Sequence, residues 1–512
     1  MGIYYETYIA PAMESLIEGT QVNRFTLVKH YHTFAITQED ADTVKEKHPD
    51  FCVCYKRFKG SEMTGAFEPF VDGIRYLYET YEQDKTPEEF IAQFQVYPLQ
   101  RSIFENMISQ LVYKRKEEVL LDEIDYEKQQ MLNSMAEIVT GLSEKYPMLF
   151  LLDNLNMASE STILLLHKLQ EDARGNIFVY GTFNELHSQL PHVAQAWEKW
   201  TEKLEDENCI ATIGGDEVEA EEESSYFSIE SSCMEEYMTK LRNMYYLLDY
   251  AQAQYYLSII YHKIEVEKLS VDEESVFRLY MLYAVISMYS DMPRALLLCD
   301  NIQMFFDKDQ PWEIIFRHRY IFGQIQMYSG NLNAAKECAD ICRRMAQEEL
   351  DEYHQFMAQL LDVMVRMSGW HNIFFCSMDI EVAPEFFEQA QRYGYENHLA
   401  YTYIFAYDND VRLMGENGAD ESLLIRFRKG VEIAKRIGNE NLLLIAYRKN
   451  IMLSSLFGLF HVANHYYYKC MEIVGDKDPA KLAFIYNGLG YSCCAAEKYE
   501  DANNYYNKAL TI

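Results

Sequence analysis

An apolar run that ends in a single acid is the feature of this chain best suited to chemistry. The segment reads Met148-Leu-Phe-Leu-Leu-Asp153 and is followed by Asn154. A buried parallel strand presents such a carboxylate at its carboxyl end, where it can bind Mg²⁺. The amide of Asn154 cannot accept a proton from attacking water, so no general base follows. Asp153 is therefore a candidate metal or nucleotide contact without its catalytic partner; an ordinary strand-end or helix-capping acid fits it equally well.

The elements around this run predict an α/β domain over residues 1–200. Strand candidates are Phe51–Tyr55, Met148–Leu152 and Ile177–Gly181, and Glu160–Asp172 has the pattern of an amphipathic helix. Strands separated by helices are typical of a parallel, doubly wound sheet.

An acidic stretch follows the α/β region. Between Glu202 and Glu236 the chain has 13 acidic residues and a single Lys, together with Gly214-Gly215 and several serines. This composition predicts a solvated linker over residues 201–236.

Helical periodicity and an internal repeat occupy residues 237–512. The last copy has small residues at Gly490 and Ala502, and a small residue on each helix lets two helices pack closely, as in tetratricopeptide (TPR) hairpins. Related positions recur at Gly323, Leu332, Ala335 and Ala339, at Phe460, Ala463, Tyr467 and Cys470, and more loosely at Met292, Ala295 and Cys299. We expect a TPR-like superhelical solenoid of about seven hairpins.

The sequence stops at Ile512, inside the second helix of a repeat and without a polar capping helix. A solenoid end of this kind exposes an apolar face. The expectation is either a truncated repeat array or a face covered by a partner or by a second copy of the chain.

Composition excludes some functions. The net charge of −34 argues against direct nucleic-acid binding, which depends on Lys and Arg. No apolar run is long enough to span a membrane and the first residues lack a basic secretory signal, so a cytoplasmic location is expected. The 11 Cys show no zinc-type spacing and are expected to be reduced, so no metal site is predicted.

Three segments resemble the STAND class (signal-transduction ATPases with numerous domains), in which an AAA-type ATPase domain is joined to TPR repeats, as in bacterial transcriptional regulators. They are Phe67-Glu-Pro69-Phe70, the Met148–Asp153 run as a Walker B strand, and Val179-Tyr-Gly-Thr-Phe-Asn184-Glu185 as the sensor strand. The resemblance implies a P-loop NTPase-like parallel sheet, ATP and Mg²⁺ as ligands, and a signalling role.

The departures from that pattern are extensive. Phosphate binding needs a G-x-x-x-x-G-K-[ST] loop, and the sequence contains none. Where the loop would fall, Phe25 to Asp40 contains no glycine, and Glu39 and Asp40 would repel phosphate. Lys29, His30 and His32 are weak candidates for a phosphate or metal contact, against the alternative of a polar strand face.

The family's catalytic residues are also replaced. Asn154 stands for the second Walker B acid, Asn156 and Met157 for the His and Trp that follow, and Asn184 for the sensor Arg. Asp153, as a degenerate Walker B acid, and Asn184, at the sensor-like position, are assigned as cofactor-binding candidates, and no catalytic residue is assigned.

These observations favour a non-catalytic interaction or regulatory protein, a pseudo-ATPase whose solenoid binds a protein or peptide on its concave surface. No cofactor is expected, although ATP with Mg²⁺ stays open. The alternative is an ATP-responsive signalling or transcriptional regulator whose effector domain lies outside this chain. An active ATPase with an upstream phosphate loop is a weaker third hypothesis.

Overall fold

The computed structural model describes residues 10–11, 24–30, 36–109, 112–115, 118–172, 174–185, 189–212, 227, 229–303, 310–368, 384–405, 422–475 and 479–512. The chain divides into two compact units. The first comprises Met1–Arg115 and Ile124–Ser287, and the second comprises Lys116–Glu123 and Met288–Ile512. The expected boundaries at residues 200 and 236 stay predictions, because compactness and sequence repeats need not divide a chain at the same residue.

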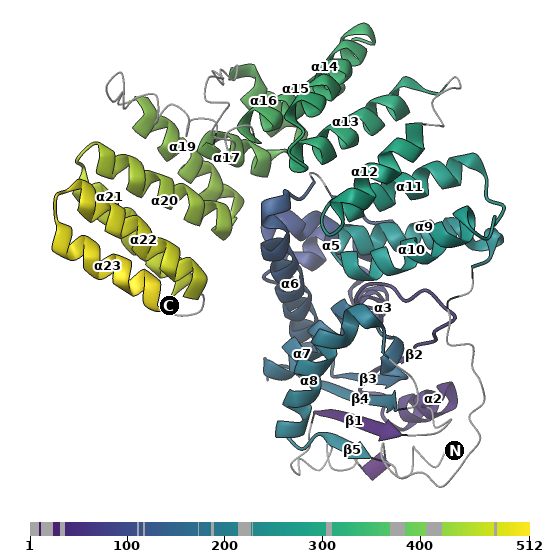
Figure 1. Cartoon of the computed structure of the whole chain (residues 1–512). Helices are drawn as coiled ribbons and strands as arrows, with labels where there is room; N and C mark the ends of the chain where they lie inside the picture. Colours follow the sequence, from purple (N-terminus) through teal and green to yellow (C-terminus); the bar gives the residue numbers. More distant parts are fainter. Residues whose placement is uncertain are drawn as a thin grey trace. The chain divides into compact units, whose positions relative to one another are not determined.

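A five-stranded sheet lies in the first unit, in the order β2-β3-β4-β1-β5 (Figure 1). Every pair is parallel, which confirms the predicted α/β fold class. The strands are β1 (Phe25–His30), β2 (Cys52–Arg57), β3 (Met148–Asp153), β4 (Ile177–Asn184) and β5 (Ile210–Thr212). All six residues of β3 are buried, as its continuous apolar sequence predicts.

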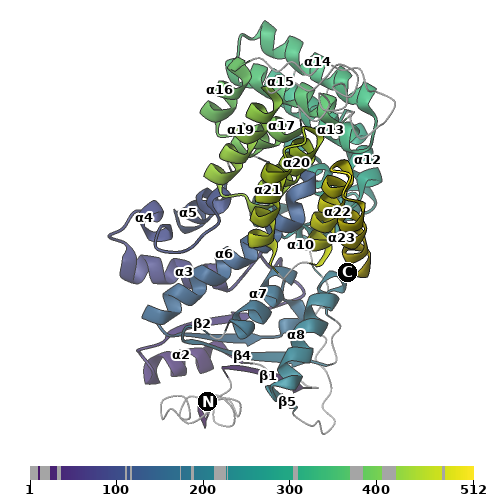
Figure 2. The ribbon, with the colours of Figure 1, turned by 90° about the vertical axis from the view of Figure 1, so that its left-hand side faces the viewer.

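The two faces of the sheet are covered by different helices. On one face, α2 (Gln38–Lys47) contributes Ala41 and Val44 to a core cluster that includes Leu149 and Leu151 of β3. On the other face, Phe150 packs against Phe70 of α3 with ring centroids 4.6 Å apart. In Figure 2, α6 and α7 lie above the sheet, on the side opposite α2. Alternation along the strand therefore fills both layers.

The remaining helices of the first unit connect the strands and follow the sheet. They are α3 (Phe70–Leu77), α4 (Pro87–Ile91), α5 (Arg101–Ser109), α6 (Ile124–Lys145), α7 (Glu160–Glu171), α8 (Ala194–Asp206), α9 (Met234–Tyr246), α10 (Tyr250–Glu265) and α11 (Glu273–Ser287). In the first part of the segment expected to be an acidic linker, residues 201–206 complete α8 and Ile210–Thr212 form β5. Buried Trp200 and Leu204 anchor that helix despite its many acids. Residues 213–226 lie outside the described part of the chain.

The second unit is built from helices that pack against their neighbours in sequence, as the repeat predicts. They are α12 (Met292–Gln303), α13 (Trp312–Tyr328), α14 (Leu332–Glu348), α15 (Glu352–Ser368), α16 (Pro384–Tyr393), α17 (Glu396–Phe405), α19 (Ser422–Ile437), α20 (Glu440–Leu456), α21 (Phe460–Val474), α22 (Pro479–Ala495) and α23 (Tyr499–Thr511). None of the helices in the described ranges is long and apolar enough to cross a membrane.

Small residues sit where the repeat pattern places them. Ala335 and Ala463 are fully buried, and Ala502 is nearly so. A Cβ at Gly323 would lie 2.8 Å from Leu361, and one at Gly490 would lie 2.6 Å from the ring of Tyr506. Any larger residue at these points would therefore force the facing side chain to shift.

Candidate functional site

The candidate nucleotide site lies where the carboxyl ends of β1, β3 and β4 meet. After β1 the chain crosses to β2, at one edge of the sheet. After β4 it crosses in the opposite direction, past β1, to β5 at the other edge. Ligands of open parallel sheets bind at such a switch point, outside the carboxyl ends of the strands. The two residues singled out from sequence, Asp153 and Asn184, end β3 and β4 at this edge.

The carboxylate of Asp153 is engaged by the protein itself. Its side chain is 3% exposed, and its Oδ1 accepts hydrogen bonds from the Ile36 backbone N–H (3.0 Å) and the Thr182 hydroxyl (2.8 Å). Its Oδ2 lies 3.3 Å from Nε of Arg57, at the end of the neighbouring strand. Both oxygens therefore have protein partners, and a cation would have to compete with the Arg57 guanidinium.

The N-terminus of α2, where a phosphate would be expected to bind, is also satisfied internally. The Asp40 carboxylate accepts hydrogen bonds from the Thr37 backbone N–H (2.9 Å) and hydroxyl (2.7 Å), and the Asp40 N–H donates to Thr37 Oγ1 (3.2 Å). Asp40 is 1% exposed. This capping box uses two of the helix-terminal N–H groups that could otherwise bind an anion, and it places a carboxylate beside them. Residues 31–35, including His32, lie outside the described residues.

Three asparagines tie the strand ends together. Asn154 has a left-handed φ of 59°, which Asn tolerates well, and its Nδ2 donates to the Phe58 carbonyl (2.9 Å). Asn156 donates to the Asn184 carbonyl and accepts from the Asn184 N–H, both at 2.9 Å. Asn154 and Asn156, which stand where the family has its second acid and its His, therefore hold the backbone of the loop after β2 and of β4.

The basic residue on β1 is paired with acids. Lys29 lies within ion-pair distance of Glu185 (3.9 Å) and Glu205 (3.6 Å). Within the described residues, no group of three or more His, Cys, Asp or Glu side chains could hold a metal ion. The arrangement as a whole can crosslink strand ends, whereas a water-activating base is not among the groups around Asp153.

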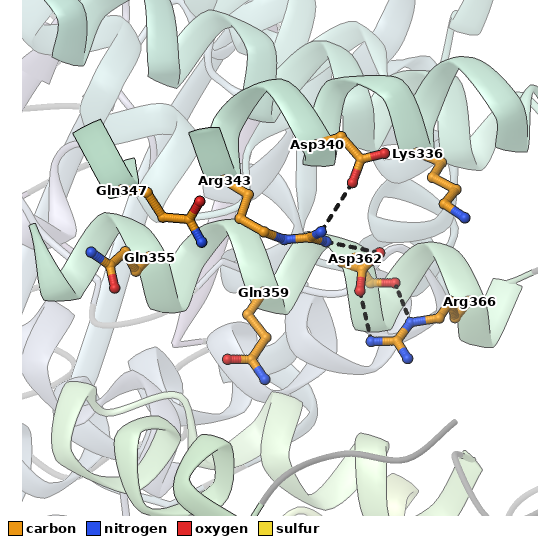
Figure 3. Close-up of a pocket in the computed structure, with 8 residues that line it drawn as sticks. All are labelled: Lys336, Asp340, Arg343, Gln347, Gln355, Gln359, Asp362 and Arg366. Atoms are coloured by element: carbon orange, nitrogen blue, oxygen red, sulfur yellow. Dashed lines mark hydrogen bonds and ion pairs between the residues drawn. The ribbon is translucent and has the colours of Figure 1, made fainter. Parts of the chain in front are cut away.

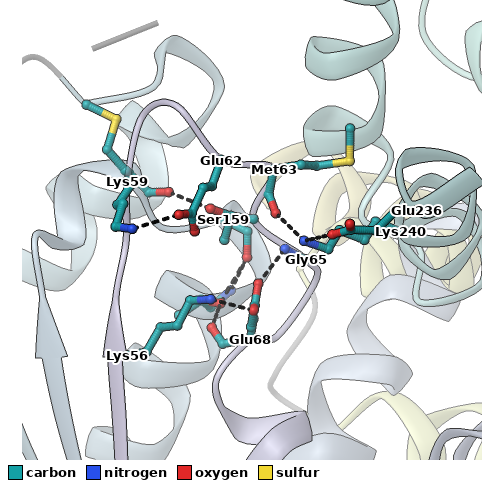
Figure 4. A network of polar contacts seen from close by, with 12 residues as sticks. Lys56, Lys59, Glu62, Met63, Gly65, Glu68, Ser159, Glu236 and Lys240 are labelled. Carbon is teal, nitrogen blue, oxygen red and sulfur yellow. Dashed lines mark hydrogen bonds and ion pairs between the residues drawn. The ribbon is translucent and has the colours of Figure 1, made fainter. Parts of the chain in front are cut away.

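A polar network fixes the loop between β2 and α3 (Figure 4). Lys56 and the Gly65 N–H both contact the Glu68 carboxylate, at 2.6 and 2.7 Å, and Lys240 of α9 donates to the Met63 carbonyl (3.2 Å). Contacts within the loop and a hydrogen bond from α9 therefore hold it beside the strand ends.

A second cluster of acids lies at the start of α7. Glu160 and Ser161 line a cavity of about 160 Å³ together with Asp249 and Lys128. The Ser161 hydroxyl donates to Asp249 at 2.5 Å. Burial, with a smaller contribution from Asp249, raises the pKa of Glu160 to about 7.

This shift predicts a pH dependence of stability. Since the folded-state pKa of Glu160 exceeds the ordinary glutamate value of 4.5, the folded protein binds more protons than the unfolded chain between pH 4.5 and 7, and stability falls as pH rises through that window. We expect Glu160→Gln to raise the unfolding free energy by about 1–2 kcal/mol at pH 8, after allowance for partial exposure, and to have little effect at pH 4.5.

Urea unfolding at the two pH values checks this, with the exposed Glu198→Gln of α8 as the control. If Glu160→Gln changed the unfolding free energy equally at both pH values, the predicted pH dependence would be contradicted.

The second unit has a polar trough of about 510 Å³ between α14 and α15 (Figure 3). Arg343 bridges Asp340 (3.1 Å) and Asp362 (3.4 Å), and Arg366 pairs with Asp362 at 2.6 Å. Its strongest charges are thus paired with one another, and such exposed pairs are typical of a solvated helix surface.

The fold and the site define a class of architecture. It combines a parallel α/β sheet, in which the polar groups at the carboxyl ends of the strands bind one another, with an array of helical hairpins. No family profile matches the chain. It is 52% identical over 42 residues, 8% of its length, to an uncharacterized protein named ycf37 from Cyanophora paradoxa, and spans 24% of that protein.

Two solved structures share parts of the arrangement. One is a STAND protein with a tetratricopeptide repeat sensor from Pyrococcus horikoshii, with 11% identity, 95% of this chain and 87% of that chain covered, and a TM-score of 0.44. The other is the apo form of RapI, with 16% identity, 54% and 96% coverage, and a TM-score of 0.38. Because both scores are below 0.5, these likenesses carry no functional argument.

The sequence singled out Asp153 but missed what holds it. Arg57 and Thr182 contact this carboxylate from two other strands, and Ile36 contacts it from the residue before Thr37. The capping box Thr37-x-x-Asp40 was readable as a helix start, since a hydroxyl followed three residues later by an acid is a local signal.

Proposed function

We propose that this chain is a non-catalytic interaction or regulatory protein, in which a pseudo-ATPase domain serves as a folded platform and the helical repeats bind a protein or peptide. The observation that carries the proposal is the occupation of Asp153 by Ile36, Thr182 and Arg57. A Walker B acid must offer its carboxylate to Mg²⁺, directly or through water, and this one is used as a crosslink between strands.

The repeats supply the interaction half of the proposal. Arrays of helical hairpins present extended surfaces to protein partners. Exposed aromatic side chains such as Tyr468 and Phe484 are available for contact, and the net charge of −34 disfavours nucleic acid as the partner. Self-association through the final helix, where Leu510 is exposed, stays a prediction.

Calorimetric titration with ATP and ADP, with and without Mg²⁺, tests the platform role. We expect no binding up to millimolar nucleotide. The alternative, an ATP-responsive regulator, requires binding that tightens with Mg²⁺ and disappears in Asp153→Asn while Asp42→Asn, an exposed acid on α2, retains it. That pattern would replace the proposed function with the alternative.

A further inference from the structure

A six-residue segment, Glu118–Glu123, groups with the helical-repeat unit although the sequence on both sides of residues 116–123 belongs to the first unit. Val119 and Leu120 are only 8% and 5% exposed, and Glu123 is fully buried. A buried carboxylate is costly unless it is hydrogen-bonded. The repeats must therefore supply its partners.

Hydrogen bonds hold the segment at both ends. At its start, Gln324 donates to the Glu118 carboxylate (3.0 Å) and the Tyr289 hydroxyl donates to the Val119 carbonyl (3.3 Å). At its end, the Glu123 carboxylate accepts from Asn441 through Oε1 (2.9 Å) and from Asn439 through Oε2 (3.3 Å). Amide side chains thus bind one carboxylate at each end.

One of the two amides at the Glu123 end, that of Asn439, is also held by other contacts. Asn439 caps α20 by accepting from the Leu442 N–H (3.0 Å), and its Nδ2 also donates to Asn397 at 2.8 Å. Asn439 and Asn397 are almost fully buried. A preorganised donor loses little entropy on binding, so this end is built to receive an acceptor.

The position of the segment on the array follows from chain length. Six residues span at most about 20 Å, yet the segment reaches Tyr289, before α12, and Asn441, in α20. Each repeat of a solenoid packs mainly on its neighbours. A segment this short can contact hairpins so far apart in sequence only if it lies on the inner side of their curve.

We propose that Glu118–Glu123 is a built-in occupant of a peptide-binding surface, and that the external partner is a peptide with the same chemistry. That peptide carries a short apolar stretch between two carboxylates five residues apart, read by Gln324 at one end and by Asn439 and Asn441 at the other. The inference rests on the proposed interaction role and adds its regulation: the segment must leave before the partner binds.

A labelled peptide tests the occupancy. The probe is the acetylated, amidated nonapeptide KEEVLLDEI, which is residues 116–124 of the chain, with a fluorophore at its N-terminus. Anisotropy is measured on the full chain and on an emptied variant in which residues 118–123 are replaced by Gly-Ser-Gly-Ser-Gly-Ser. We expect the emptied variant to bind at least about tenfold more tightly, because a tethered occupant competes at high effective concentration. Asn441→Asp in the emptied variant should abolish the gain through repulsion of the peptide carboxylate.

The outcomes separate this inference from the function it rests on. Equal binding to both proteins would overturn the occupancy and leave peptide binding standing. Binding to neither, with both folded, would overturn the occupancy and count against a peptide-binding role. A second peptide carries Lys at the positions of Glu118 and Glu123. If it bound as tightly as the original peptide, the assigned chemistry alone would be overturned.

If the emptied variant does not fold, peptide binding to Glu123→Gln in the full chain tests the occupancy instead. This change keeps the side-chain shape and replaces a charged acceptor by a neutral one, which weakens hydrogen bonds by about 1 kcal/mol, or about fivefold. We expect the peptide to bind about fivefold more tightly to Glu123→Gln than to the wild type, and unchanged binding would overturn the proposal.

Discussion

Asp153→Ala is expected to lower the stability of the first unit by about 3 kcal/mol, because it removes the acceptor of a buried N–H and a buried hydroxyl and leaves the guanidinium of Arg57 without this partner. Urea unfolding followed by tryptophan fluorescence measures the effect. Trp197 and Trp200 of α8 report on this unit, since Trp197 stacks on Phe183 of β4 with centroids 4.5 Å apart.

Three comparison variants define what the carboxylate does. Asp153→Asn keeps one acceptor oxygen and should therefore lose less stability than Asp153→Ala. Arg57→Ala should cost only about 1 kcal/mol, because its side chain is 37% exposed. Asp42→Ala, exposed on α2, should change stability by less than about 0.5 kcal/mol. If Asp153→Ala matched Asp42→Ala, the carboxylate would not be structural and the pseudo-ATPase interpretation would lose its main support.

Glu127→Ala is expected to have the largest effect on folding, a loss of about 3–5 kcal/mol. Glu127 lies in α6, is fully buried, and its Oε2 accepts from Arg115 (2.8 Å) and from Gln100 (2.8 Å). The Arg115 side chain is itself only 6% exposed. Removing the carboxylate therefore leaves a buried guanidinium charge without its counter-ion.

Replacement of both partners separates the cost of a broken pair from the value of the intact one. Arg115→Met with Glu127→Leu substitutes apolar side chains for the buried pair, which is often neutral or stabilising, so the double variant should be more stable than Glu127→Ala. Asp125→Ala, exposed on the same helix, is the matched control. Thermal unfolding of the four proteins checks the order, and a double variant less stable than Glu127→Ala would contradict this explanation.

Much of the fold was readable from local pattern. The uninterrupted apolar run of β3 and the alternation of short strands with helices predicted the parallel sheet. The small residues at Ala335, Ala463 and Ala502 predicted the helical hairpins, and all three are buried as expected. Periodicity succeeds here because it records which side of an element faces the core. Composition says less about residues 201–212, where many acids suggested a linker, yet residues 201–206 complete a helix with buried anchors such as Trp200.

The sequence by itself determined the absence of a glycine-rich phosphate loop and the single acid at Asp153. Only the tertiary structure decided what that acid does, since Ile36 is 117 residues away in the chain. The same holds for Glu123, whose partner Asn439 is 316 residues away. Neither pair has a local signature, because a hydrogen bond between distant residues depends on how packed elements bring the donor and acceptor within about 3 Å, and not on the residues that surround either one in sequence.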